Sequence, residues 1–208
     1  TAYRRQRQMC IRDSNNGYSV TMSKNGLMIA YGDPSPNKGS GKAYAFKYNS
    51  TSDSYVQIGG KMSDNMVYYG GIIRMSDDGN TIIIGTMDGL YDGTGVNIYK
   101  LNQTNNSWVR VFREIKGLSN DYGVVIGISD NGEYAGYIAD DGRGYDHDII
   151  ILKYDNSKNT FNKIQTISNI ADKDFGNGTR NIKFSSDNKY VYINLSLIHI
   201  SEPTRPRL

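Results

Sequence analysis

A repeat with a period of about 53 residues runs through most of this sequence and constrains its fold more than any other feature. The columns in register are a glycine (Gly17, Gly70, Gly123 and Gly176), a serine that opens a polar turn (Ser23, Ser76 and Ser129), an aromatic residue (Tyr55, Trp108 and Phe161) and a β-branched residue (Ile58, Val111 and Ile164). Because independent columns agree on one period, the sequence predicts an array of similar units that stack on one another.

Each unit is expected to contain short strands joined by polar turns. Runs of β-branched and aromatic residues indicate strands, and clusters of Asp, Asn and Gly indicate tight hairpins between them. The expected strands are 18–22, 27–31, 42–48 and 55–58 in the first unit, 71–75, 81–86, 96–101 and 108–112 in the second, 124–128, 134–139, 148–154 and 161–167 in the third, and 181–184 and 190–194 in the fourth. No segment shows the apolar rhythm of an amphipathic helix.

Four antiparallel strands in a unit of this length are typical of a β-propeller blade. The fold class we expect is all-β: an antiparallel partial β-propeller of three four-stranded blades plus half of a fourth, with repeats at about 17–69, 70–122, 123–175 and 176–194. The aromatic column should pack between outer strands of neighbouring blades, and the glycine column should mark a sharp turn onto an inner strand. We expect the missing blades of the propeller to belong to a longer form of the chain.

Both ends of the chain differ from the repeats. Residues 4–14 resemble the translation of a transposase sequencing adapter, and residues 195–205 resemble the matching adapter from the other end. We therefore expect residues 1–14 and 195–208 to be adapter-derived and the propeller to occupy residues 15–194.

The repeats carry almost no net charge. The chain has 24 basic and 21 acidic residues, but the terminal segments hold six of the arginines and two of the acids, which leaves 18 basic and 19 acidic residues and a net charge of −1. This balance gives no reason to expect nucleic acid or an anionic membrane as a partner. No run approaches the roughly 18 apolar residues of a membrane span, and the one cysteine, Cys10, lies in the N-terminal segment.

Short motifs in the repeats resemble a known family. An aromatic residue precedes the repeated glycine in Tyr69-Gly70, Tyr122-Gly123 and Phe175-Gly176, and the first unit also has Gly32-Asp33-Pro34. With the strand–turn–aromatic segment 96–109, these motifs resemble FG-GAP repeats, the blades of integrin α-chain propellers. The resemblance implies recognition of a protein or glycan and an extracellular or cell-surface location. Calcium-binding members have an Asp-rich first loop, which here has shrunk to residues 76–79 and offers too few oxygens for calcium.

A second resemblance gives the same fold and another function. Residues 128–134 and 184–190 resemble hairpins of periplasmic and lactonase-type propellers. The alternative is therefore a lactonase- or hydrolase-type enzyme with a site at the central channel. Carboxylates, amides and a histidine converging from inner strands would favour the enzyme, whereas channel-lining Val20, Ile73 and Val125 would favour a scaffold.

The expected function is non-catalytic recognition through loops between strands. No catalytic residues are assigned, because His147 is the only histidine of residues 15–194 and no serine–histidine–acid or cysteine–histidine set can be assembled. No cofactor is expected. Partner-binding candidates in the loops between the second and third strands are Asp33, Asp88, Tyr91, Asp92, Tyr145 and His147. These loops occupy equivalent places in three units. If they crowd one rim they form a partner surface, and the alternative is independent loops around the outside.

Two further kinds of site are predicted. Asp140, Asp141, Asp146 and Asp148 are weak candidates for a hard-cation site such as calcium, although a solvated loop whose Asp and Gly residues favour turns explains the same composition. Asn49, Asn102, Asn105 and Asn177 begin glycosylation sequons. The first three lie in hairpins between third and fourth strands, which should be exposed.

Overall fold

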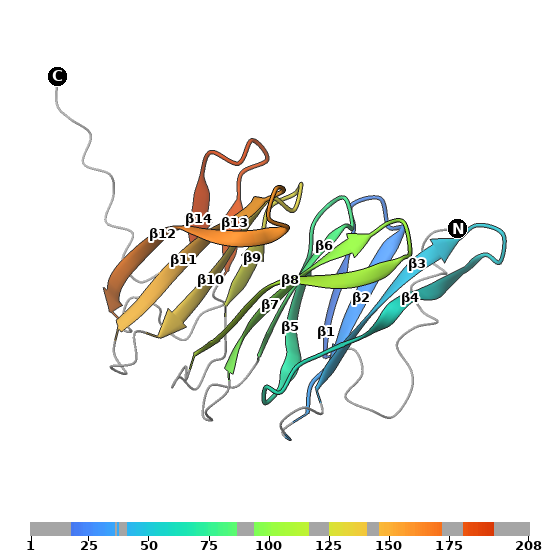
Figure 1. Ribbon diagram of the computed structural model, residues 1–208, viewed down its shortest axis with the longest axis horizontal. Coiled ribbons are helices and arrows are strands. Elements are labelled where there is room, and N and C mark those ends of the chain that lie inside the picture. Colours follow the sequence, from blue (N-terminus) through green and yellow to red (C-terminus); the bar gives the residue numbers. More distant parts are fainter. Residues whose placement is uncertain are drawn as a thin grey trace.

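The computed structural model describes residues 18–35, 37, 41–86, 94–116, 125–140, 146–171 and 181–193. These residues form three four-stranded sheets and one two-stranded sheet, and the strands of each sheet follow in chain order. All the pairings are antiparallel. Figure 1 shows the sheets side by side as successive blades. The predicted fold class, a partial β-propeller of three blades and half of a fourth, is confirmed.

The strands fall where the repeat places them. Blade 1 contains β1 (Ser19–Met22), β2 (Met28–Asp33), β3 (Lys42–Asn49) and β4 (Ser54–Ser63). Blade 2 contains β5 (Tyr69–Met75), β6 (Thr81–Thr86), β7 (Thr94–Asn102) and β8 (Ser107–Lys116). Blade 3 contains β9 (Ile126–Ile128), β10 (Tyr134–Asp140), β11 (Asp146–Asp155) and β12 (Thr160–Ala171). The half-blade contains β13 (Ile182–Phe184) and β14 (Val191–Ile193).

The fourth strand of each full blade is longer than predicted. In blade 1 the predicted end at residue 58 is wrong, because β4 continues to Ser63 through an irregularity in its pairing with β3. Gly59 has a φ of +64° there, a conformation that glycine adopts at little cost. A bulge of this kind absorbs extra residues and lets the strand continue past Gly59 and Gly60.

The first strands of the units lie innermost. Contacts link β1 to β5, β5 to β9 and β9 to β13, whereas β4 contacts β8 and β8 contacts β12 at the outside. The predicted turn onto an inner strand is present at Gly70. This glycine is the second residue of β5 and has a φ of +89°. Gly17, Gly123 and Gly176 lie outside the described residues.

The repeated serine closes the first hairpin of each unit. Ser23, Ser76 and Ser129 are at most 1% exposed. Their hydroxyl oxygens accept the N–H groups of Met28, Thr81 and Tyr134 at 2.9, 3.0 and 2.9 Å, and their O–H groups donate to Asn25, Asp78 and Asn131. Ser185 makes the equivalent bonds to Tyr190 and Asp187 at 3.0 and 2.7 Å, so the fourth unit keeps this hairpin.

These hairpins also hydrogen-bond from blade to blade. The Lys24 N–H donates to the Asp77 carbonyl oxygen at 3.0 Å, and the Asp77 N–H donates to the Asp130 carbonyl oxygen at 2.8 Å. A backbone N–H of each turn therefore pairs with a backbone carbonyl oxygen of the next turn along the rim. We call this series the rim bonds.

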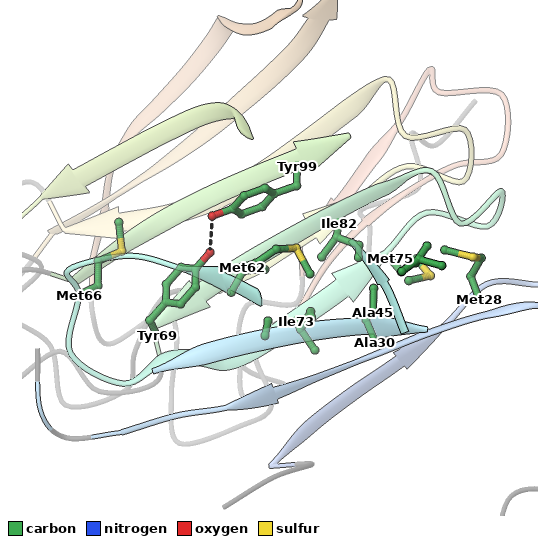
Figure 2. Packing of buried hydrophobic residues seen from close by; sticks show 13 residues of the cluster. Met28, Ala30, Ala45, Met62, Met66, Tyr69, Ile73, Met75, Ile82 and Tyr99 are labelled. Carbon is green, nitrogen blue, oxygen red and sulfur yellow. Dashed lines mark hydrogen bonds between the residues drawn. The ribbon is translucent and has the colours of Figure 1, made fainter. Parts of the chain in front are cut away.

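The core consists of the seams between blades. Seam 1–2, the contact between blades 1 and 2, buries Met28, Ala30, Ala43, Ala45, Ile58 and Met62 of blade 1 against Tyr69, Ile73, Met75, Ile82, Ile84 and Tyr99 of blade 2. Figure 2 shows these side chains between the two sheets. Seams 2–3 and 3–4 are built in the same way. Since full burial of an Ile such as Ile73 contributes about 1.5–3 kcal/mol, the seams are the main source of stability.

The aromatic column behaves as predicted where a preceding blade is present. Trp108 packs against the core of seam 1–2, and Phe161 is 3% exposed within seam 2–3. Tyr55 has no described blade before it. Its ring instead meets Tyr48, and its hydroxyl donates to the Gly26 carbonyl oxygen at 2.6 Å.

Candidate functional site

The predicted cation loop lies largely outside the described residues. Asp140 ends β10 opposite His147, and Asp148 is half-buried on β11 opposite Ala139. Asp141 is not described, nor are the side chains of Asp140, Asp146 and His147. Across the described part of the chain, no three His, Cys, Asp or Glu side chains group as a metal site. The cation site stays a prediction.

The predicted partner loops are described only at their edges. Asp33 is half-buried at the end of β2, with Lys42 as its neighbour on β3. Asp88, Tyr91, Asp92 and Tyr145 lie outside the described residues. The shared rim surface therefore also stays a prediction.

Three of the four predicted glycosylation residues are placed. Asn49, Asn102 and Asn105 are exposed in the hairpins that join third and fourth strands, as expected. Each side-chain oxygen accepts the backbone N–H two residues later, at 2.9, 3.0 and 3.1 Å respectively. Asn177 lies outside the described residues. Glycosylation itself stays a prediction.

Two of the three apolar residues whose presence in the channel would have favoured a scaffold, Ile73 and Val125, are buried in seams instead. Ile73 is 0% exposed in the core of seam 1–2, and Val125 is 8% exposed in the core of seam 3–4. Val20 is 57% exposed on the outer face of blade 1. Side chains of a strand point to the two faces of its sheet, so inner-strand side chains enter the seams between blades.

A buried polar site, which the sequence reasoning missed, lies in seam 1–2. Asp64, in the connection between β4 and β5, has a side chain only 4% exposed. Arg113 donates Nε to Oδ2 at 2.9 Å and Nη2 to Oδ1 at 2.8 Å, and Arg110 Nη1 donates to Oδ2 at 2.7 Å. Asn97 Nδ2 and the Asn65 N–H donate to the same carboxylate at 2.8 and 2.7 Å.

This arrangement holds Asp64 ionised. Burial alone would raise the pKa of its carboxyl, but the hydrogen bonds from Arg113, Asn97 and the Asn65 backbone lower that pKa to about 2. The carboxylate is thus a structural anion at neutral pH. It ties β8 of blade 2 to the end of blade 1.

Two tyrosines extend the network into the core. Asn97 Nδ2 also lies 3.3 Å from the Tyr69 hydroxyl, which donates to the Tyr99 hydroxyl at 3.1 Å. Figure 2 shows the two tyrosine hydroxyls, both from blade 2, pointing toward one another. Burial raises the pKa of Tyr69 well above its usual value and also raises that of Tyr99, so both remain protonated donors. Asn97 Oδ1 is buried without a hydrogen-bond partner.

A hollow of about 390 Å³ adjoins this network; we call it the seam pocket. Its lining comes from β4, β7 and β8 and consists of Gly60, Lys61, Met62, Ser63, Tyr99, Ser107, Trp108 and Arg110. The volume falls in the range of small-ligand sites. The indole N–H of Trp108 is buried without an acceptor. Lys61 and Arg110 bring cationic donors to the pocket, Tyr99 brings a hydroxyl, and Trp108 brings an aromatic ring.

Local backbone geometry opens the pocket. Trp108 Cδ1 lies 3.0 Å from where a Cβ of Gly59 would be, so the indole packs over bare backbone at the β4 bulge. At Gly60, no atom lies within 4 Å of such a Cβ. The bulge thus supplies both the seat for the ring and the empty space beside it.

The sequence did not reveal the Asp64 network because the strand that carries both arginines is irregular. Residues three apart on a regular strand face opposite sides, so Arg110 and Arg113 would not share a ligand. A register shift in β7–β8 pairs Tyr99 with Arg110 and Ile98 with Phe112, leaving Val111 as an extra residue. This bulge turns both arginines to Asp64. The one available signal was the repeat, since Lys163 stands one period after Arg110 and pairs with Glu114 at 2.8 Å in seam 2–3.

No helix within the described residues is long and apolar enough to cross a membrane. Comparison with models of known protein families gives no match, and comparison with curated proteins gives none. Similar solved structures do exist. Sqt1 of Saccharomyces cerevisiae has a TM-score of 0.52 and 9% identity over 75% of this chain and 36% of its own. This similarity supports the fold.

Two other similar structures carry the names of lactonases. A Bacteroides fragilis protein proposed to be a 6-phosphogluconolactonase has a TM-score of 0.48 and 19% identity over 73% of this chain and 39% of its own. The periplasmic gluconolactonase of Pseudomonas aeruginosa has a TM-score of 0.42 and 10% identity over 84% of this chain and 64% of its own. Their names match the alternative function, but likeness at this level does not transfer activity. The chain spans 36–64% of the length of these three proteins.

Proposed function

We propose that this chain is a non-catalytic recognition scaffold that binds a glycan or protein partner. The observation that carries the proposal is the seam pocket, in which an aromatic ring stands beside donors from Lys61, Tyr99 and Arg110. A ligand rich in acceptors and carrying a negative charge complements such a lining, because unpaired donors gain hydrogen bonds and the cation gains a partner. Of the two partner classes, a glycan with carboxylate groups fits best.

The rigidity of the site supports this function. Tyr99 is 6% exposed and is held by Tyr69, while Arg110 is held by Asp64. Recognition sites whose groups are fixed before binding lose less entropy on binding. The loops between second and third strands, with Asp33 as their described member, are a second proposed contact surface for the partner.

The relation to FG-GAP repeats is part of this proposal. Gly32 and Gly70, from the two motifs that carry the resemblance, approach each other closely across seam 1–2. Such motifs therefore have a packing role here that is independent of metal, and we propose no cofactor. An extracellular or cell-surface location, in keeping with glycan recognition, is proposed with it.

The pocket has its own reporter. Trp108 is the single tryptophan of the chain and lines the pocket, so its fluorescence can follow binding. Oligogalacturonate should change the emission saturably. Uncharged cello-oligosaccharides should bind with a Kd at least about tenfold higher. Lys61→Ala should weaken binding of the acidic ligand. Lys47→Ala should not, because Lys47 is an exposed residue of β3 outside the pocket.

Equal response to both glycans, or to both lysine variants, would contradict recognition at the seam pocket. A screen of acidic peptides on the same preparation separates a protein partner from a glycan. The same preparation tests the lactonase alternative. Hydrolysis of 6-phosphogluconolactone or gluconolactone above the spontaneous rate would contradict the recognition proposal and favour the lactonase.

A further inference from the structure

The inner edge of β5 is closed by hydroxyl groups of blade 1. The Ile73 N–H donates to Ser19 Oγ at 3.0 Å, and the Met75 N–H donates to Thr21 Oγ1 at 3.1 Å. The Ser76 N–H turns to the β6 side, so the two alternating donors before it turn to the other edge. Because the first strands lie innermost, this edge faces the axis of the propeller. Side-chain oxygens of β1 thus satisfy backbone groups that no paired strand reaches.

The inner edge of β9 presents equivalent N–H groups. The Val125 carbonyl oxygen and the Ser129 N–H both hydrogen-bond with the β10 side of the sheet. By the same alternation, the N–H groups of Ile126 and Ile128 turn to the inner edge. They stand one period after the two donors of β5. Ile126 is 2% exposed, whereas Ile128 is half-buried and is the more accessible of the two.

The repeat puts a cation where the Ile128 N–H would find its acceptor. Arg74 stands one period after Thr21, and Ile72 stands one period after Ser19. A guanidinium has only donors and an isoleucine side chain has no polar atom, so neither can accept a backbone N–H. Among the residues that the structure describes, no side chain accepts the Ile128 N–H. A backbone donor and a cation therefore adjoin at the place where blade 1 supplies an oxygen.

The guanidinium of Arg74 is held at this edge with its charge unpaired. The side chain is exposed, and Nη1 donates to the Ile73 carbonyl oxygen at 2.9 Å. Across the described ranges of the chain, no acidic side chain pairs with it. The bond to a neutral carbonyl oxygen fixes the position of the guanidinium without neutralising it, and leaves further N–H groups to donate. An oxyanion satisfies both a guanidinium and a backbone N–H.

We propose that Arg74 and the Ile128 N–H bind an oxyanion, a carboxylate or a phosphate, at the inner edge between blades 2 and 3. One oxygen takes the place that Thr21 Oγ1 has between blades 1 and 2, and it accepts the Ile128 N–H. A second oxygen accepts N–H groups of the guanidinium. This site is separate from the seam pocket, which β4, β7 and β8 line, and it does not depend on the proposed function.

The test is a titration of the isotope-labelled full 208-residue chain with sodium phosphate and, separately, with sodium acetate, followed by nuclear magnetic resonance. Sodium chloride at equal ionic strength is the reference salt. The Ile128 amide resonance should shift saturably, and the oxyanion with the lower Kd identifies the class of ligand. The Met75 amide resonance should shift less, because its N–H already has an acceptor.

Substitutions at Arg74 locate the anion. Arg74→Gln should raise the Kd by about tenfold or more, because a charge-assisted contact is lost. Arg74→Thr restores the hydroxyl that blade 1 carries at this place. It should also abolish binding, and it should raise the midpoint of thermal unfolding by about 2–4 °C, because the hydroxyl oxygen accepts the Ile128 N–H. Lys47→Ala is the matched control, since Lys47 is an exposed cation of β3, and the Kd should stay within about twofold.

The outcomes that overturn the proposal are distinct from those that test the seam pocket. A Kd that Arg74→Gln leaves unchanged rules out this site. If Lys61→Ala raises the Kd instead, the anion lies in the seam pocket, and the proposed function stands while this site does not. Equal shifts of Ile128 and Met75, or the same shifts with chloride, mean a general effect of salt and overturn the proposal as well. Circular dichroism establishes that each variant is folded.

Discussion

Gly32 on β2 and Gly70 on β5 approach each other across seam 1–2 so closely that a Cβ on Gly32 would lie 1.8 Å from the Gly70 carbonyl oxygen. The obstacle is backbone, which cannot rotate away as a side chain could. We therefore predict that Gly32→Ala forces the two blades apart and lowers the free energy of unfolding by about 1–3 kcal/mol or more. Urea unfolding followed by circular dichroism measures this change.

Gly60→Ala is the matched control for that substitution. Gly60 is also a strand glycine of blade 1, but no atom lies within 4 Å of a Cβ placed on it. The alanine should leave stability within about 0.5 kcal/mol of the wild-type value. Equal losses for the two variants would mean that strand conformation, and not the approach of the blades, decides the effect at Gly32.

Asp64 predicts an acid-sensitive contribution to stability. The folded-state pKa of about 2 lies below the usual value of 3.8, so the contribution is present above that usual value and is lost as the pH falls toward 2. Because Arg110 and Arg113 are 44% and 43% exposed, solvent screens the pairs and we expect Asp64→Asn to cost about 1–2 kcal/mol at pH 7.

Unfolding of the Asp64→Asn and wild-type chains at pH 7, 4 and 2.5 measures this contribution. The difference between them should shrink at the lowest pH. Asp77→Asn serves as the comparison, because its partner Lys24 is 78% exposed and an exposed pair is worth less than about 1 kcal/mol. A difference between Asp64→Asn and wild type that does not change with pH would contradict the assignment of the effect to ionisation.

The hairpin serine should matter for a different reason. Ser76 is 1% exposed, and its Oγ accepts the Thr81 N–H at 3.0 Å. Ser76→Ala leaves that buried N–H without its acceptor, so we predict a loss of about 1–3 kcal/mol in unfolding free energy. Ser52→Ala, at an exposed hairpin where the hydroxyl meets only Ser54, should change stability little. Thermal unfolding of both variants makes the comparison.

The fold was predictable because each unit repeats the same hairpin and strand features. The serine hairpin occurs four times, and the strand between residues 81 and 86 was predicted with its observed bounds. Agreement between turn chemistry, strand propensity and period is the condition under which sequence determines structure well. The aromatic column was predicted to pack between neighbouring blades, and it does so at Trp108 and Phe161.

The candidate site was not predictable by the same rules, because it depends on departures from them. The bulge at Val111 brings Arg110 and Arg113 to one face, and the bulge at Gly59 makes room for Trp108. Both break the alternation on which strand assignments rest. Asp64 stood in a segment that was expected only to connect two blades, where nothing in the sequence distinguishes a buried carboxylate from a turn residue.

The ion pair of seam 2–3 supplies the last prediction. Lys163 on β12 lies 2.8 Å from Glu114 on β8, with side chains 43% and 16% exposed, and the Tyr137 hydroxyl donates to the same carboxylate at 2.6 Å. Since this pair is more buried than Lys24–Asp77, a double-mutant cycle with Lys163→Met and Glu114→Gln should give a coupling energy of about 0.5–1 kcal/mol. The corresponding cycle at Lys24 and Asp77 should give a value closer to zero. Urea unfolding in low and high salt measures both, and a larger coupling for the exposed pair would show that burial does not set the strength of the contacts between blades.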